Sequence, residues 1–201
     1  MTDVSAGGRT PSRAVEQALV DAAERVLVRD GLGAVTVRAV ATEAGVAPMG
    51  VYNRFGSKHG LIAAVLVRGF DGLAGSIRVR EDADPVERLS ACGRSYRRFA
   101  LAHPQHYEAM FGSGVSPADR AAASSEELNR HATAAFDVLV DEVARAMDAG
   151  VLRRDDPREA ASVIWSAVHG AVALELAGVT QVADPDATYE RLLVALVSGL
   201  G

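Results

Sequence analysis

The sequence has few of the residues that form disulfides, linkers and export signals. Its 201 residues include one cysteine, Cys92, and seven prolines. A single cysteine excludes an intramolecular disulfide, and its apolar helical surroundings favour a packed thiol in a reducing compartment over a redox role. Glycine and proline do not cluster into a linker or a low-complexity segment. Because residues 1–9 are polar and lack a continuous apolar core, we expect no signal peptide and a cytoplasmic location.

Catalytic and metal-binding patterns are also missing from the sequence. It contains no Ser/His/Asp set, no phosphate-binding loop and no paired carboxylates, so it predicts neither an enzyme nor a cofactor. Residues 31–33, Gly-Leu-Gly, follow a predicted helix rather than a strand, which indicates a turn. Pro104 breaks the predicted helix between His103 and His106, and no cysteine or carboxylate stands at metal-ligand spacing from them. No metal site is therefore expected.

What the sequence does contain is a set of repeated helix starts. Five times a small polar residue precedes a proline, a pairing in which the polar side chain caps the helix and proline takes its first position. No alternating polar and apolar segment bounded by turns indicates a strand, and the 49% apolar content is enough for a core. We therefore predict an all-α protein. The capping pairs are Thr10-Pro11, Asp84-Pro85, Ser116-Pro117, Asp156-Pro157 and Asp184-Pro185. The predicted helices cover about 11–30, 37–44, 48–54, 58–79, 85–102, 104–112, 117–149, 157–178 and 186–199.

Residues 36–58, TVRAVATEAGVAPMGVYNRFGSK, combine two short helices around a glycine turn. Thr36 is placed to cap the first helix with its hydroxyl, and Gly45 can end it in the left-handed conformation. Pro48 is suited to begin the second helix. A helix of seven residues is marginal alone, so its apolar residues must pack against a preceding helix. The residues expected to do so are Val46, Val51 and Phe55.

This arrangement is typical of a helix-turn-helix, in which the second helix reads the major groove of DNA. The outward face of that helix carries Met49 and Gly50, which either contact thymine methyl groups or let the backbone approach closely. The candidate DNA-binding residues are Thr36, Arg38, Pro48, Met49, Gly50, Tyr52, Asn53 and Lys58.

Individual roles follow from side-chain chemistry. The ring of Tyr52 can pack on the unit while its hydroxyl reaches a phosphate. Lys58 combines a flexible cation with the free amides of the next helix, and Arg38 has the geometry to bind guanine. Of Asn53 and Arg54, we expect one to face DNA and the other to brace the turn.

The net charge of −5 conceals an uneven distribution. Residues 1–70 hold eight basic and six acidic residues, whereas the remainder holds 13 basic and 20 acidic residues. The N-terminal part is therefore mildly basic on an acidic body. It can attract phosphates locally, and we expect only modest non-specific affinity for DNA.

The segment 36–58 resembles the N-terminal unit of the TetR (TetR/AcrR) family of bacterial repressors. That family carries the pattern Thr-x-x-x-Ile-Ala-x-x-Ala-Gly-Val-Ser-x-x-x-x-Tyr-x-His-Phe-x-x-Lys. The chain departs from the family at Ala47, where a Ser or Thr cap is usual, at Arg54, where His is usual, and at Gly60, where an acidic residue completes a capping box. The positions that match are Thr36, Val40, Ala41, Ala44, Gly45, Val46, Tyr52, Phe55 and Lys58.

The resemblance implies a homodimeric repressor that binds a palindromic operator in double-stranded DNA and is released by a small molecule. It also implies a dimer interface built from the last two long helices, about 157–178 and 186–199. We accordingly expect a flexible arm at 1–9, a DNA-binding domain at 10–57 and a ligand-binding and dimerisation domain at 58–201. The helix from Ser57 belongs to both domains and is the expected lever between them. An activator, or a helical small-molecule-binding protein or enzyme without a DNA-binding role, is the alternative.

The C-terminal part holds most of the aromatic residues, and it resembles the WHG-type C-terminal domain of some TetR-like regulators. The likeness rests on Tyr96-x-x-Phe99-Ala-Leu-Ala-His103-Pro104 and on Trp165-x-x-x-His169-Gly170. Aromatic rings with a few polar tips suit a small apolar ligand, although each residue alone also fits ordinary core packing. The candidate ligand-binding residues are Tyr96, Phe99, His103, Tyr107, Phe111, Trp165 and His169.

The segment 160–182 is almost wholly apolar and long enough to suggest a membrane span. His169 and Glu175 interrupt it, and a helix that is apolar all round is equally expected where a core is also an interface. Its small residues allow close approach of another helix. We therefore expect a dimer interface and no membrane segment here.

Overall fold

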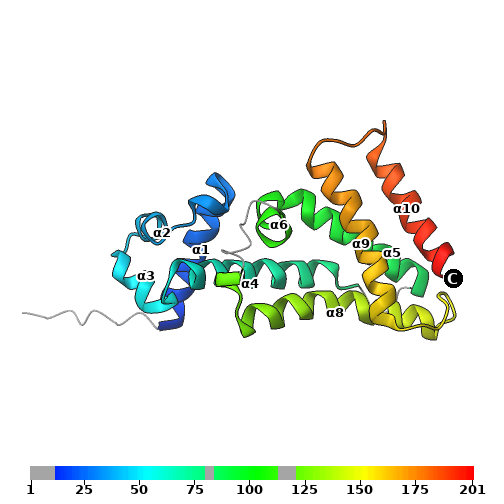
Figure 1. Cartoon of the computed structure of the whole chain (residues 1–201), viewed down its shortest axis with the longest axis horizontal. Helices are drawn as coiled ribbons and strands as arrows, with labels where there is room; N and C mark the ends of the chain where they lie inside the picture. The colour runs from blue at the N-terminus through cyan, green and yellow to red at the C-terminus, as the bar shows by residue number, and fades with distance from the viewer. Residues whose placement is uncertain (1–11, 80–83, 113–120) are drawn as a thin grey trace, which may run out of the picture.

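The computed structural model describes residues 12–79, 84–112 and 121–201, and all regular structure in these ranges is helical. The predicted all-α fold is confirmed. Figure 1 shows a small unit at one end, from which a long helix leads to the larger body. The small unit contains α1 (Ser12–Asp30), the 3₁₀ helix η1 (Leu32–Ala34), α2 (Val37–Ala44) and α3 (Pro48–Phe55), and the long helix is α4 (Lys58–Ile77). The body adds α5 (Pro85–Ala102), α6 (Pro104–Phe111), α8 (Glu126–Asp148), α9 (Pro157–Leu176) and α10 (Pro185–Leu200).

Proline punctuates the chain as the sequence predicts. All prolines within the described ranges stand at a helix start, and the caps Asp84, Asp156 and Asp184 each accept a backbone N–H of the following turn. These side chains satisfy amides that the helix itself leaves unpaired. The pairs Thr10-Pro11 and Ser116-Pro117, and the predicted arm at 1–9, lie outside the described residues.

The predicted continuous helix over 117–149 is wrong. Residues 121–123 are helical, but the chain then leaves the helix, and α8 begins afresh at Glu126. The hydroxyl of Ser125 accepts the N–H of Leu128 at 3.1 Å and caps the new helix. A serine followed by two acidic residues is a strong N-terminal signal, because the acids also complement the helix dipole. The predicted turn at 31–33 overlaps the short 3₁₀ helix η1, which Gly31 precedes.

The packing of α4 and an ion pair between α5 and α8 hold the body together. α4 packs against α1 and α3 at one end and against α5, α6 and α8 along its length. α5 is tied to α8 by a buried ion pair in which Arg88 donates to both carboxylate oxygens of Glu142, at 2.8 and 2.6 Å. Since both side chains are buried, the pair fixes the position of α5 against α8.

Within the described residues, α4 is the one helix long and apolar enough to cross a membrane by length and composition. Its buried side chains pack on five other helices, as in the core helix of a folded domain. The apolar segment 160–182 is not a single helix, since α9 ends at Leu176 and Gly178 adopts a left-handed φ of 68°. The remainder of that segment forms the connection to α10.

Candidate nucleic-acid interface and interior cavity

The turn between α2 and α3 has the geometry that the sequence predicts. The hydroxyl of Thr36 accepts the N–H of Ala39 at 3.2 Å, which caps α2. Gly45 has φ 68° and ψ 31°, so it reverses the chain in the left-handed conformation. The N–H of Val46 then bonds back to the carbonyl of Ala41 at 2.9 Å. α3 can therefore begin at Pro48, three residues after Gly45.

The packing of α3 confirms part of the prediction for its apolar residues. Val51 is fully buried, and Phe55 packs partly buried against the core. Val46, however, is 39% exposed, so its predicted burial is wrong. A Cβ at Gly50 would lie 4.0 Å from a Val46 methyl group, which places Val46 beside Gly50 on the outer side of the turn. Val46 thus adds an apolar side chain to the exposed face of α3.

That exposed face carries the residues singled out in the sequence. Pro48, Met49, Gly50, Tyr52 and Asn53 are exposed, with 64% of Met49 and 49% of Tyr52 open to solvent. Figure 1 places α3 at the end of the molecule away from α10. An eight-residue helix held by Val51 and presenting this face outward has the shape that a DNA groove accepts.

The flanking candidates take different positions. Arg38 is exposed in the first turn of α2, whereas Thr36 is half-buried as its cap. Lys58 is half-buried at the start of α4, next to the cap Ser57. Neither Arg38 nor Lys58 forms an ion pair with another described residue, so both cations can meet phosphate.

Other basic residues of the small unit hold the helices together. Arg54 lies 3.6 Å from the carboxylate of Glu16 on α1, so Arg54 braces α3 and Asn53 is the exposed member of that pair. Arg25 and Arg29 of α1 donate to Glu43 of α2 at 2.7 and 3.0 Å. These hydrogen bonds hold the pKa of the Glu43 carboxyl below its usual value.

The junction between α3 and α4 explains one departure from the family pattern. The hydroxyl of Ser57 caps α4 by accepting the N–H of Gly60 at 3.1 Å. A Cβ at Gly60 would lie only 2.1 Å from the carbonyl oxygen of Phe55, a backbone atom. The backbone at this position therefore has no room for the acidic side chain of a capping box.

Replacing Gly60 with alanine is expected to push α3 away from α4. Because the clash is with backbone, we expect a loss of roughly 2 kcal/mol in the free energy of unfolding and a DNA affinity at least about tenfold lower. Urea unfolding and fluorescence anisotropy measure the two effects. Gly75→Ala on the same helix is the control, since a Cβ there meets nothing within 4 Å. Equal behaviour of the two variants would contradict this role of Gly60.

The body contains a partly open cavity of about 430 Å³. Side chains from α4, α5, α6, α8, α9 and α10 line it, and no charged residue is among them. Three of the predicted ligand-binding residues, Tyr96, Phe111 and Trp165, stand in its wall. The sequence did not single out Phe70 of α4 or Phe136 of α8, which also line it. Both belong to apolar helix faces, and only the packing of those helices brings them to the cavity.

Tyr107 and His169 adjoin this wall through Tyr96. Nδ1 of His169 lies 2.7 Å from the hydroxyl of Tyr96 and 3.0 Å from that of Tyr107. The His169 ring also stacks on Tyr107 with 5.3 Å between centroids. Burial lowers the pKa of His169, so the neutral imidazole accepts a hydroxyl hydrogen bond. The three residues form a polar cluster whose hydrogen bonds are made internally.

The other two ligand candidates lie elsewhere. Phe99 and His103 line an open hollow where α1, α4, α5 and α6 meet. The side chain of His103 packs against Phe99, with 5.0 Å between ring centroids. Helical spacing puts Tyr96 and Phe99 on neighbouring faces, but α5 turns only the first of them into the cavity. Among the described residues, no group of three His, Cys, Asp or Glu side chains is placed to hold a metal ion.

Cys92 lines the cavity but is 3% exposed. Burial, with a smaller contribution from the Glu142 carboxylate, raises the pKa of the Cys92 thiol to about 12. The thiol is therefore protonated at neutral pH and acts as a packing group.

The burial of His169 predicts a pH effect on stability. Its folded-state pKa is below the ordinary value of 6.5, so the unfolded chain binds a proton more tightly than the native chain. The stability associated with neutral His169 is complete above about pH 6.5 and is lost as the pH falls through the folded-state value. Urea unfolding at fixed protein concentration between about pH 7.5 and 5 should therefore show a steeper loss for the parent chain than for His169→Gln. Parallel curves of stability against pH for the two proteins would contradict this role of His169.

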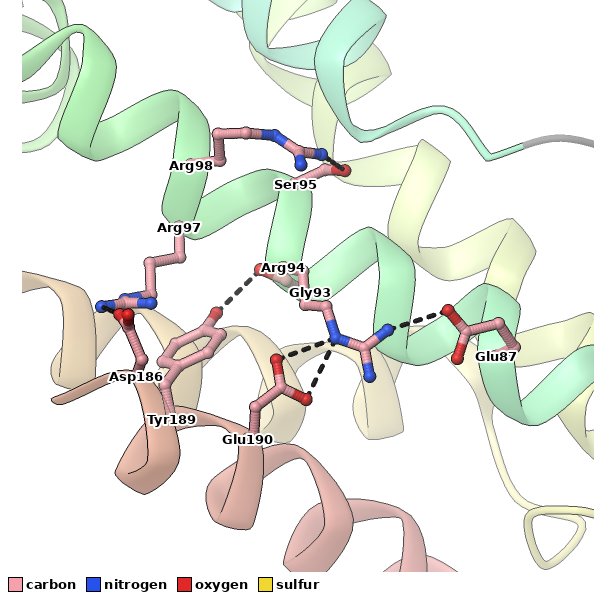
Figure 2. A network of polar contacts seen from close by, with 9 residues as sticks. All are labelled: Glu87, Gly93, Arg94, Ser95, Arg97, Arg98, Asp186, Tyr189 and Glu190. Carbon is pink, nitrogen blue, oxygen red and sulfur yellow. Dashed lines mark hydrogen bonds and ion pairs between the residues drawn. The ribbon is translucent and has the colours of Figure 1, made fainter. Parts of the chain in front are cut away.

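Polar contacts bind α10 to α5, as Figure 2 shows. Arg94 donates to Glu190 at 2.8 Å, and the hydroxyl of Tyr189 donates to the carbonyl of Gly93 at 2.9 Å. A Cβ at Gly93 would lie 2.6 Å from a methyl group of Leu193, so the bare backbone lets α10 approach closely. These contacts orient the outer surface of α10.

The outer surfaces of α9 and α10 expose large apolar side chains to solvent. Val163 and Leu174 of α9 are 53% and 55% exposed, and Val194 of α10 is 65% exposed. Gly170 lies between the two α9 residues in sequence, and a Cβ there would meet nothing within 4 Å. The exposed side chains and the open space at Gly170 leave this face suited to contact with another helix pair.

Sequence patterns of known families match most of the chain. The family described as bacterial regulatory proteins, tetR family, matches residues 19–65, and the tetracyclin repressor-like C-terminal domain matches residues 89–196. The first range includes α2 and α3, and the second includes most of the cavity wall.

Individual relatives extend along the whole chain. The HTH-type transcriptional regulator Rv0681 of Mycobacterium tuberculosis is 28% identical, over 98% of this chain and 91% of its own length. A protein with unknown function from Rhodococcus sp. RHA1 superposes with a TM-score of 0.80 at 25% identity, covering 98% of this chain and 99% of that one. The fatty acid degradation regulator FadR from Bacillus halodurans has the same fold, with a TM-score of 0.73 at 18% identity over 96% and 98% of the two chains.

Proposed function

Because the chain belongs to the TetR family of DNA-binding transcriptional regulators, we propose that it is a homodimeric repressor that leaves its operator when a small molecule enters the cavity. Proteins of this family regulate transcription and are not enzymes. The observation that carries the proposal is the exposed face of α3, which is held in place by the buried Val51. Residues 10–57 form the proposed DNA-binding domain, and residues 58–201 form the ligand-binding and dimerisation domain.

The proposed reading helix is α3. Met49 and Gly50 meet base edges, Tyr52 and Lys58 bind phosphates, and Asn53 reaches into the groove from the same exposed surface. Pro48 supports close approach because it begins α3 without an N–H group. Thr36 and Arg38 at the start of α2 contact the flanking backbone or a guanine.

The proposed dimer pairs α9 and α10 with the same helices of a second copy. Val163, Leu174 and Val194 are the exposed apolar side chains that such a four-helix interface buries. The twofold axis then presents two copies of α3 to successive half-sites of a palindrome, about one DNA turn or a multiple of it apart.

Selection of duplexes from a random library with the purified protein tests this proposal. We expect the enriched sequences to contain inverted repeats, and sedimentation of the complex to show two or a multiple of two protomers per duplex. Enriched sequences without twofold symmetry, or one protomer per duplex, would refute the homodimeric repressor.

The proposed route for ligand response runs through α6. Phe111 of α6 lines the cavity, and Met110 packs against α4 at Gly69, where a Cβ would lie 3.0 Å from the Met110 sulfur. At the other end of α6, Nε2 of His106 lies 3.4 Å from the carboxylate of Glu24 on α1. Arg68 of α4 donates to the same carboxylate at 2.7 Å. A shift of α6 therefore reaches both helices that carry the DNA-binding unit.

A ligand releases DNA only if it favours one arrangement of these helices over another. The Arg68→Met variant removes the ion pairs from α4 to α1 but leaves the cavity unchanged. We expect it to bind the selected duplex and to respond several-fold less to any compound that releases the parent protein. Anisotropy titrations with and without that compound measure the response. An unchanged response would remove Arg68 from the route.

A further inference from the structure

We infer that the cavity binds an uncharged, predominantly apolar aromatic molecule and rejects anions of the same shape. The inference rests on the proposed function, in which this cavity holds the effector, and it adds the chemical class of that effector. Three features of the wall support it: its rings, its lack of charge, and the internal pairing of its polar atoms.

Five aromatic side chains surround the cavity, each from a different helix. Phe70 and Phe111 meet edge to face with 5.7 Å between ring centroids, and Phe136 and Trp165 do the same at 6.2 Å. Tyr96 completes the set. These are five of the ten aromatic residues in the whole chain. Edge-to-face packing of this kind extends naturally to an aromatic guest, since ring faces and edges remain to be covered.

The wall offers no partner for a charge. No acidic, basic or histidine side chain lines the cavity. The buried ions of the neighbouring helices, Arg88 and Glu142, already bond to each other through two hydrogen bonds. A carboxylate in the cavity would lose its water without gaining a cation, at a large cost in binding free energy. A neutral molecule avoids that cost.

The polar atoms of the wall are largely satisfied without a ligand. The hydroxyl of Tyr96 is paired with His169 at 2.7 Å, and the hydroxyl of Ser162 donates to the carbonyl of Arg158 at 2.9 Å. The hydroxyl oxygen of Ser162 still has capacity to accept a hydrogen bond, so a guest with a single alcohol or phenol group can be accommodated. The cavity volume of about 430 Å³ falls in the ordinary range for ligand pockets and suits a molecule of about two or three rings.

The single tryptophan of the chain provides the test, because Trp165 stands in the cavity wall. The probes are 9-anthracenemethanol and 9-anthracenecarboxylate, which share one ring system, accept energy from tryptophan and differ in charge at about pH 7.5. We expect saturable quenching of Trp165 by the alcohol and binding at least about 100-fold weaker by the carboxylate. Binding of the carboxylate within about tenfold of the alcohol, or binding of neither probe, would overturn the inference.

Two alanines of α8 locate the binding site. Ala132 lines the cavity, so Ala132→Phe should fill it and abolish quenching by the alcohol. Ala134 is exposed on the same helix and takes no part in the cavity wall, so Ala134→Phe should bind the alcohol like the parent. Equal binding by both variants would place the probe outside the cavity and overturn the inference. Anisotropy of a selected duplex is read separately: binding of the alcohol without release from DNA leaves the ligand class standing and counts against the proposed ligand response.

Discussion

The double variant Tyr52→Ala, Lys58→Ala is expected to bind its selected duplex at least about 100-fold more weakly than the parent protein. Each protomer loses one phosphate hydrogen bond and one cation, so a dimer loses two of each. Tyr52 is 49% exposed, and Lys58 pairs with no acidic group among the described residues, so the fold should survive both changes. Circular dichroism and anisotropy titrations measure the fold and the affinity.

The salt dependence of DNA binding distinguishes the loss of a phosphate contact from general damage to the fold. The variant dimer loses two lysine–phosphate contacts, so the slope of log affinity against log salt concentration should become shallower by about two. Arg98→Ala is the control, because Arg98 is an exposed cation on α5 that bonds only to Ser95 in the described structure. If the double variant and the control kept the same affinity and slope, the exposed face of α3 would not be the reading surface.

The Gly170→Arg variant is expected to break the dimer and, with it, operator binding. A Cβ at this position meets nothing within 4 Å in the protomer, and arginine favours a helix more than glycine does. Across a twofold interface, however, two arginines would face each other where close approach is needed. Sedimentation at micromolar concentration should show the 21.0 kDa protomer instead of twice that mass. Affinity for a palindromic duplex should fall about 1,000-fold, since each half-site is then bound separately.

The matched control lies on α4. Gly75→Arg introduces the same charge at an exposed glycine where, as at Gly170, a Cβ meets nothing within 4 Å. It should remain dimeric and bind the duplex. A dimer of unchanged stability in Gly170→Arg would show that α9 does not form the interface.

Local signals in the sequence predict most of the helices of the fold. The caps Asp84, Asp156 and Asp184 and the prolines after them mark helix starts because each satisfies or removes an amide at its own position. The turn at Gly45 is equally local, since it needs only one left-handed residue. The break before α8 has a local signal too, in Ser125 and the acids after it, but helical periodicity on both sides hides it.

Contacts between segments far apart in the sequence could not be predicted from it. Phe70 and Phe136 look like ordinary core residues until α4 and α8 are packed around one cavity. Conversely, Phe99 shares the aromatic pattern of Tyr96 yet faces a different hollow, because the rotation of α5 is set by its partners. The exposure of Val46 and the close approach of Gly60 to the Phe55 backbone likewise depend on how α3 meets its neighbours.

Dimethyl sulfate footprinting of a selected duplex tests the central claim most directly, because it reports which guanines are covered in the major groove. If α3 is the reading helix of a symmetric dimer, protected guanines should fall in two equivalent half-sites, in successive major grooves on one face of the duplex. The same protections should vanish for Tyr52→Ala, Lys58→Ala at the parent's binding concentration. Protection confined to the minor groove, or an unchanged footprint in the double variant, would contradict the account.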